Sequence, residues 1–260
     1  IAVVLTAILL VLRNQLVDLV VTSTKKEISS LAEHNASLSS EYFSTMQTQA
    51  ASLAKTLSQL DNAELTPKEK QNLILNIMSG VLKDDRIFGV YTAWEPDLAF
   101  SNTPDGLSFY MYRSDSEIKT DILNDYAVYN EGDYYSVAKT TKAAHITEPY
   151  AYELTNGSTA WLITISNPIL DSSGRFLEVS NCDIMADTIN QLNYSKGEYS
   201  KAYSYLLSYG GSYLAHTENQ DLMGKPFGET MKNQENRQEI LALTASGTQK
   251  QWEYFDETLG

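Results

Sequence analysis

The sequence predicts an α+β fold in which one long N-terminal helix is followed by short helices and antiparallel β-sheets. Three observations lead to this prediction. A helical pattern without Pro or Gly fills residues 14–60, alternating strand patterns begin after residue 85, and a strand, glycine turn and strand occur twice, at 162–184 and 203–215. We therefore expect two related antiparallel units beside one long helix.

Composition narrows the function classes. The chain has 260 residues, 43% of them hydrophobic, and a formal net charge of -14 with a pI of about 4.6. Such a chain can bury a sizeable core, while its acidic surface repels nucleic acid, so no nucleic-acid partner is expected. The single cysteine, Cys182, excludes an internal disulfide and a CxxC metal or redox motif.

The N-terminal segment predicts a membrane anchor. Residues 1–12 are apolar or small and Arg13 ends the run, which is shorter than the roughly 20 residues of a spanning helix. Because the chain starts at Ile1, we expect residues 1–13 to be the outer end of a transmembrane helix that anchors the domain. A buried core helix and a cleaved signal peptide remain alternatives.

Residues 14–62 are expected to continue as one long amphipathic helix. Its apolar side chains recur at helical spacing and form one stripe, suited to a core or to the seam of a homodimer. The stripe comprises Ile28, Leu31, Leu38, Tyr42, Met46, Leu53, Leu57 and Leu60.

A second helix should begin at Pro67. Thr66 precedes it and Glu69 follows Thr66 by three positions, which is the capping-box pattern, and proline is favoured at the first helical position.

The remaining chain alternates strands, turns and short helices. Asp105 and Gly106 form the tip of a turn between the first two strands, and segment 117–142 is expected to be helical in pieces. We expect strands at 86–96, 107–113, 145–154, 159–170, 175–185 and 250–255, a hairpin around Gly210 and Gly211, and helices at 185–195 and 233–245.

The order of these features resembles the extracellular double Cache sensor domain of bacterial chemoreceptors and sensor kinases. The residues that carry the resemblance are the membrane-exit helix, Tyr134 and Tyr135 with the later Thr-Glu-Pro-Tyr at 147–150, and two strand–turn–strand segments at 163–184 and 205–225. The resemblance covers roughly residues 10–260.

The resemblance implies two stacked PAS-like modules carried by the long helix. Residues 63–197 would form the membrane-distal module, which binds a small molecule, and residues 198–260 an incomplete membrane-proximal module. It implies an extracellular or periplasmic sensor domain of a chemotaxis receptor in the cell membrane, acting in signal transduction as a homodimer through the long helix.

The family's amino-acid site can be carried over by position. The tryptophan of its Arg-x-Trp-Tyr motif falls on Tyr134, the following tyrosine on Tyr135, the later tyrosine on Tyr150 and the strand-ending aspartate on Asp183. Its arginine position holds Gly132. The family's first tyrosine falls near Ala127, beside Tyr126, while Tyr110, Tyr91 and Trp94 lie on strands expected to form the pocket floor.

Glycine at 132 changes the expected ligand. Arginine grips a carboxylate with two hydrogen bonds, and glycine cannot. Asp183 and the aromatic rings can still bind an ammonium group, so we expect an amine-like or other small polar ligand. The tyrosines could instead be core residues, and Asp183 could cap the helix that follows it.

No catalytic, metal or cofactor site is expected. His34, His145 and His216 lie far apart in sequence, and no Ser, His and Asp set can be argued from spacing. We expect no enzyme activity. The same sensor on a histidine kinase or diguanylate cyclase, and a structural or adhesion domain without a ligand, remain alternatives.

Overall fold

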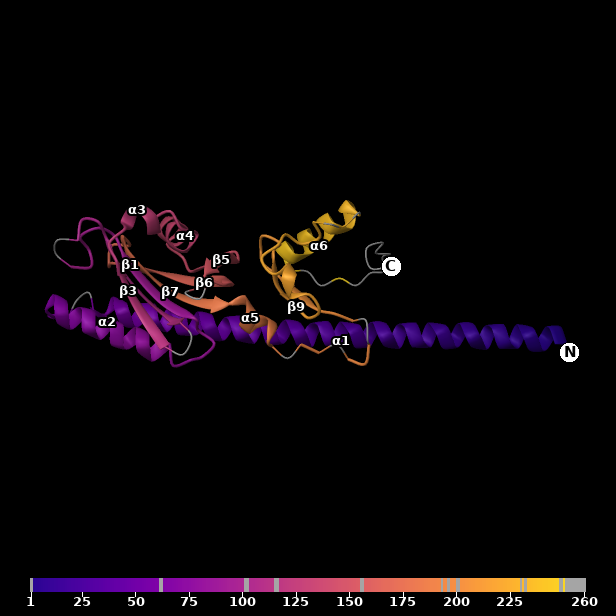
Figure 1. Cartoon of the computed structure of the whole chain (residues 1–260). Coiled ribbons are helices and arrows are strands. Elements are labelled where there is room, and N and C mark those ends of the chain that lie inside the picture. Colours follow the sequence, from indigo (N-terminus) through magenta and orange to yellow (C-terminus); the bar gives the residue numbers. More distant parts are fainter. Residues whose placement is uncertain are drawn as a thin grey trace.

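Helix α1 (Ala2–Ser58) runs the length of the molecule, and two separate units of the chain pack on one side of it (Figure 1). The computed structural model describes residues 2–60, 63–100, 103–114, 117–154, 157–192, 194–195, 197–199, 202–229, 231, 233–247 and 250. The unit at the far end of α1 contains the larger sheet, and we call it the distal module. The unit nearer the N-terminus is the proximal module.

The elements follow one another in an α+β order, as expected. The distal module contains α2 (Pro67–Val81), β1 (Gly89–Trp94), β2 (Leu107–Ser114), β3 (Glu117–Leu123), α3 (Tyr126–Tyr129), α4 (Asp133–Thr141), β4 (His145–Ile146), β5 (Tyr150–Glu153), β6 (Thr159–Leu170), β7 (Phe176–Met185) and α5 (Ala186–Asn190). The proximal module contains β8 (Tyr205–Leu207), β9 (Tyr213–His216), the 3-10 helix η2 (Gln220–Leu222) and α6 (Gln234–Ser246).

Helix α1 has two different halves. From Val4 to Ser23 every side chain is exposed, and an apolar window of this helix has mean hydropathy 1.9, which makes it a candidate membrane span. Farther along, Tyr42, Met46 and Leu57 are buried against the distal module. The helix continues without a break through residue 13, and the exposed Ile28 lies outside the core stripe.

The predicted capping box is present at the start of α2. The Thr66 side chain accepts the backbone N–H of Glu69, and the Glu69 carboxylate accepts the backbone N–H of Thr66 at 2.9 Å. These bonds satisfy N–H groups that a helix start leaves without partners, which fixes where the chain turns back along α1.

The distal sheet is antiparallel, in the order β3-β2-β1-β7-β6-β4, with β5 also paired to β6. Its two faces have different roles because side chains alternate along each strand. Val90, Met111 and Cys182 lie in one cross-strand row and pack toward α1 and α2. The next row, with Tyr91, Tyr110 and Asn181, faces the side of α3 and α4.

Two strand predictions needed correction. Segment 117–123, expected to be helical, is the edge strand β3, and all seven of its side chains are exposed. Ile118 and Ile122 are four residues apart, which fits both a helix face and one face of a strand, so the pattern was ambiguous. The expected strand 145–154 is two strands, because 147–149 leave the ladder around Pro149.

Other expectations are confirmed. Strands β1, β2, β6 and β7, the Asp105-Gly106 turn, the hairpin at Gly210-Gly211 and helix α6 lie where the sequence placed them. Only 186–190 of the expected helix 185–195 is α-helical. The expected final strand, 250–255, lies outside the described residues except for Lys250, and the module boundaries stay predictions.

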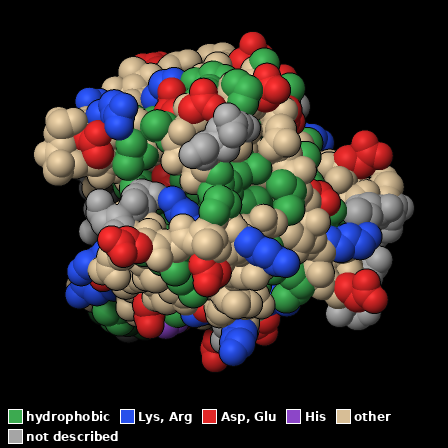
Figure 2. Space-filling view, turned by 90° about the vertical axis from the view of Figure 1, so that its left-hand side faces the viewer, with side chains coloured by type: hydrophobic (Ala, Val, Ile, Leu, Met, Phe, Trp, Pro, Cys, Tyr) green, Lys and Arg blue, Asp and Glu red, His purple; other side chains and the backbone are tan. Residues whose placement is uncertain are grey.

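The end of the distal module farthest from the N-terminus carries mixed charges. Figure 2 looks onto this end and shows acidic and basic side chains around patches of hydrophobic side chains.

The two modules contact each other through the Thr-Glu-Pro segment and β6. The Glu148 carboxylate accepts hydrogen bonds from the buried Ser208 hydroxyl and, at 2.8 Å, from the Gly210 N–H. The Trp161 ring lies so close to Gly224 that any Cβ there would be 2.2 Å from it. At Gly224, φ is also +75°, which favours glycine.

We expect Glu148→Ala to loosen the proximal module. A charged acceptor contributes more than a neutral one, but Glu148 is exposed to water, so the expected loss is about 1 kcal/mol, or roughly fivefold in local opening. Hydrogen exchange of the Gly210 amide measures it, with Glu153→Ala, an exposed carboxylate on β5, as the control. Unchanged exchange would show that this contact does not hold the modules together.

Candidate functional site

A cavity of about 320 Å³ lies on the α3–α4 side of the distal sheet. Its floor comes from β1, β2, β6 and β7, and its walls come from β3, α3, α4 and β5. It is lined by Tyr91, Tyr110, Asp121, Leu123, Asp125, Val128, Tyr129, Tyr134, Tyr150, Tyr152, Thr164, Asn181 and Asp183.

Asp183 is the buried acid of the floor. Strand alternation sends Asp183 and Asn181 into the cavity and Cys182 into the opposite core. The Asp183 side chain accepts a hydrogen bond from Thr164 Oγ1 at 2.7 Å, and the residue is only 5% exposed. Burial raises the pKa of Asp183 to about 6, although the hydrogen bond from Thr164 and the nearby Tyr110 hydroxyl oppose this.

Asp183 is not a helix cap. The N-cap of α5 is Met185, and no side-chain bond caps that helix. The carboxylate is therefore directed to the cavity and to Thr164, whose hydroxyl also lies 2.9 Å from the Tyr150 hydroxyl.

Tyrosine rings surround this carboxylate. Tyr134 packs edge-to-face on Tyr91 with centroids 5.6 Å apart, and Tyr91 packs in the same way on Tyr110 at 5.9 Å. Gly89 makes room for the ring of Tyr110, since a Cβ at 89 would lie 2.8 Å from it. The rings present both faces and edges to a bound molecule.

Several buried polar atoms at this cavity lack a hydrogen-bond partner. They are the hydroxyls of Tyr91 and Tyr110, both amide atoms of Asn181 and Oδ1 of Asp125. Tyr110 lies close enough to Asp183 for the two groups to affect each other's pKa, but its hydroxyl makes no bond of good geometry. Because buried polar groups are normally paired, this set points to a polar ligand.

The lining contains acids and no bases. Asp121, Asp125 and Asp183 are its charged residues, and no Lys, Arg or His is among the described residues that line it. At Gly132, which caps the start of α4, a Cβ would lie 2.4 Å from the Tyr134 ring, so an arginine there would require Tyr134 to move.

The structure separates the two adjacent tyrosines. Tyr134 lines the cavity, but Tyr135 is fully buried and donates to Glu95 Oε1 at 2.6 Å. Tyr126 also donates to Glu95, and Lys139 pairs with Glu95 at 2.7 Å. Successive helix positions point about 100° apart, so Tyr134 and Tyr135 cannot share one wall. Contrary to the expectation, Tyr135 and Tyr126 lie outside the cavity.

Of the other expected residues, Tyr110, Tyr150 and Asp183 do line the cavity, and so does Tyr91. Trp94 packs on Phe109 in the opposite core. Sequence reasoning missed Asn181 and Asp125. The position of Asn181, two residues before Asp183 in a strand, was a signal for it, whereas nothing in the sequence marked Asp125.

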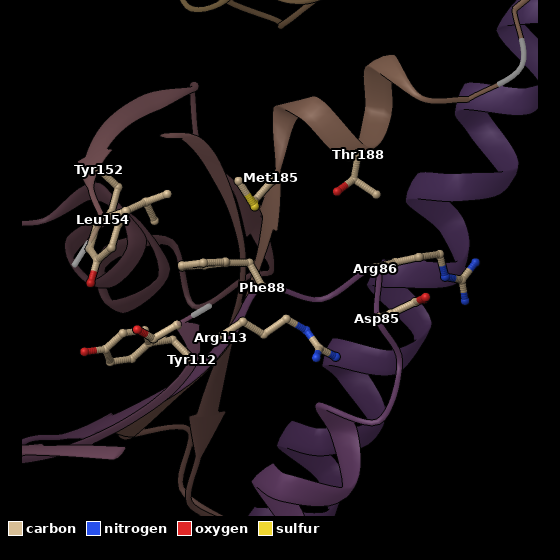
Figure 3. A pocket seen from close by; sticks show the side chains of 10 residues that line it. Asp85, Arg86, Phe88, Tyr112, Arg113, Tyr152, Leu154, Met185 and Thr188 are labelled. Carbon is tan, nitrogen blue, oxygen red and sulfur yellow. The ribbon is translucent and has the colours of Figure 1, made fainter. Parts of the chain in front are cut away.

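A second cavity of about 270 Å³ lies on the other side of Tyr152 (Figure 3). Phe88, Tyr112 and Leu154 border it, and Arg113 extends from it toward the helices. The Arg113 guanidinium donates to the backbone carbonyls of Ile87, Leu82 and Asp84. Arginine therefore holds the loop after α2 together here, and this cavity is the weaker candidate for a charged ligand.

The described part of the chain shows neither a metal-binding site nor a reactive thiol. No group of three or more His, Cys, Asp or Glu residues there could hold a metal ion. Cys182 is fully buried, and burial raises its pKa above its ordinary value. The His216 ring accepts two backbone N–H groups and stacks on Tyr203, which is a structural role.

One family model matches the distal module. Residues 74–191 match the model of the methyl-accepting chemotaxis protein-like, first PDC sensor domain. The matched range contains the whole distal sheet and every residue that lines the candidate cavity. No curated protein matches the chain.

Solved structures share the fold at low identity. The extracellular domain of mmHK1S-Z3, a protein assigned as a histidine kinase, is 21% identical, with a TM-score of 0.67 over 84% of this chain and 80% of that one. The periplasmic sensory domain of Campylobacter jejuni chemoreceptor Tlp1 is 17% identical, with a TM-score of 0.65 over 83% and 79%.

A third similar structure is the ligand-binding domain of C. jejuni chemoreceptor Tlp3 in complex with L-norvaline. It is 18% identical and has a TM-score of 0.58 over 79% of this chain and 74% of that one. The family model identifies residues 74–191 as a PDC (Cache) sensor domain like the first one of methyl-accepting chemotaxis proteins, and the similar structures show that the fold of the chain is that of such sensor domains.

Proposed function

We propose that this chain is the extracellular or periplasmic sensor of a transmembrane chemotaxis receptor, and that its distal cavity binds a small amine-like cation. The observation that carries the proposal is the buried carboxylate of Asp183, in a tyrosine-lined cavity whose described lining contains no basic residue. Burial removes the water that would stabilise the charge of Asp183, and a bound ammonium group would stabilise this charge instead.

The energetics favour a cation over a neutral ligand. An ammonium group at Asp183 would form a charge-assisted hydrogen bond, and the rings of Tyr134, Tyr110 and Tyr150 can each add about 0.5–2 kcal/mol of cation–π attraction. The unpaired amide of Asn181 can accept from the same ligand or donate to it. Binding would then satisfy several buried groups in one step.

The amino-acid ligand of a similar domain does not transfer directly. The Tlp3 domain was solved with L-norvaline, which carries a carboxylate as well as an amine. In this chain the carboxylate would meet Asp121, Asp125 and Asp183, and position 132 is glycine. Repulsion among like charges therefore favours an amine without a carboxylate.

The family model favours a chemotaxis receptor as the protein that carries this sensor, since it describes chemotaxis-protein-like sensors. A histidine kinase is the second candidate, since the fold of mmHK1S-Z3 is similar. The exposed apolar half of α1 would anchor the domain in the cell membrane, and the same helix would pair with that of a second copy.

Hydrogen bonds suggest how binding is transmitted. Thr164 donates to Asp183, and its backbone makes two hydrogen bonds with Thr147: the Thr164 N–H donates to the Thr147 hydroxyl, and the Thr147 N–H donates to the Thr164 carbonyl. The next residue, Glu148, contacts the proximal module. A ligand that shifts Thr164 or Tyr150 would shift this segment and, through the proximal module, its contact with α1. Coupling of this kind amounts to about 1–3 kcal/mol between the two conformations.

We expect propylamine and ethanolamine to bind the detergent-solubilised chain, and propionate not to bind. Asp183→Asn should weaken amine binding at least about tenfold, since the charged acceptor is lost. Isothermal titration calorimetry measures this, with Asp187→Asn, an exposed carboxylate on α5, as the control. Tighter binding of L-norvaline than of propylamine would show that another group holds a carboxylate and that the proposed ligand class is wrong.

The stability of the ligand-free fold should decrease as the pH rises, because Asp183 is buried. Its pKa rises from the ordinary value of 3.8 to about 6 in the fold. Below pH 4 the carboxyl is protonated in both states; between about pH 4 and 6 only the unfolded chain loses the proton, so the fold loses stability. Two pH units at about 1.4 kcal/mol each set an upper limit of about 3 kcal/mol.

Urea unfolding of the ligand-free chain at pH 4 to 7 tests this. The wild type should lose about 2–3 kcal/mol relative to Asp183→Asn across this range, and then no more at higher pH. Parallel curves for the two proteins would contradict the burial of an uncompensated Asp183.

A further inference from the structure

The cavity lining holds more negative charge than one ammonium group can balance. Asp121, Asp125 and Asp183 lie at different points of the lining, and the described lining residues include no positive side chain. The inference drawn from this charge rests on the proposed function, since it concerns the same site. It raises the question of what neutralises the other carboxylates when Asp183 has a partner.

Asp125 is the second carboxylate that needs a partner. It precedes helix α3 at the N-cap position, yet its side chain makes no capping bond. Its Oδ1 is buried and has no hydrogen-bond partner. An unpaired, buried carboxylate oxygen is costly, whereas the Asp121 side chain is exposed to solvent.

Asn181 shows independently that the cavity is built for a polar ligand. Its side chain is 0% exposed, it lines the cavity, and neither amide atom has a partner. Tyr134 relates the two acids in space: burial, Asp183 and Asp125, in that order, raise the pKa of its hydroxyl to about 12. Both carboxylates therefore act on the same ring.

A single divalent metal ion does not fit this arrangement. Among the described residues, no three acidic, His or Cys side chains come close enough to share one ion. Two positive charges separated in space, as on a flexible organic dication, match the two buried carboxylate positions instead.

We propose that the ligand is a diammonium compound, with one ammonium group on Asp183 and the other on Asp125. The methylene chain between them lies against the rings of Tyr134 and Tyr91, where apolar contact and cation–π attraction at each end stabilise it. The amide oxygen of Asn181 accepts a hydrogen bond from the ammonium group at Asp183. The distance between the two carboxylates selects the chain length.

The test compares diamines with monoamines of equal carbon number. Diaminopropane, diaminobutane, diaminopentane and diaminohexane are titrated into the solubilised chain at physiological salt, alongside the matching alkylamines. We expect the best diamine to bind at least about tenfold more tightly than its monoamine, since it gains a second charged hydrogen bond. Asp125→Asn should reduce this ratio below about threefold, and Asp187→Asn, with the same charge change at an exposed site outside the cavity, should leave it unchanged.

The outcomes separate this inference from the proposed function. If monoamines bind through Asp183 but the ratio is near one in the wild type, the diammonium ligand is excluded and the amine sensor remains. Loss of the ratio in Asp121→Asn rather than Asp125→Asn would also overturn the assignment. If neither monoamines nor diamines bind, both the amine-like ligand of the proposed function and the diammonium ligand are excluded.

Discussion

The burial of the Asp183 carboxylate is the constraint on which the site depends. A carboxylate that is 5% exposed and held by Thr164 is unfavourable unless something positive approaches it. The fold holds it there because β7 is an inner strand of the sheet, paired on one side to β1 and on the other to β6. Packing of the core thus offsets the cost of burying this carboxylate, which can then bind a cation; ionisable groups perturbed by burial are common at functional sites.

The two-faced sheet makes this arrangement possible. One face is apolar and packs on α1 and α2, so it fixes the strands in place. The other face carries tyrosines whose hydroxyls and rings can face a ligand. Because Thr164 and Thr147 connect this face to Glu148, and Glu148 contacts Ser208, the site and the proximal module belong to one hydrogen-bonded path.

Sequence patterns predicted the elements better than the side-chain directions. Periodicity located α2 and the second half of α1, because each buries one face, whereas β6 and β7 were located as long apolar runs that are buried on both faces of the sheet. It failed for β3, whose side chains are all exposed and leave no burial pattern to read. Tyr135 was assigned to the ligand because it adjoins Tyr134, but neighbours on a helix point in different directions, and only the fold shows which one meets the cavity.

The ionisation of Asp183 is the most direct test of a cation-binding cavity. It can be followed by NMR titration of the ¹³C-labelled Asp183 carboxyl, with and without saturating propylamine. The burial of this acid predicts a midpoint near pH 6 without ligand and one well below that with the amine bound, because an adjacent positive charge favours the ionised form. A midpoint in the ordinary range of aspartate under both conditions would show that the carboxylate is neither buried nor paired with a cation.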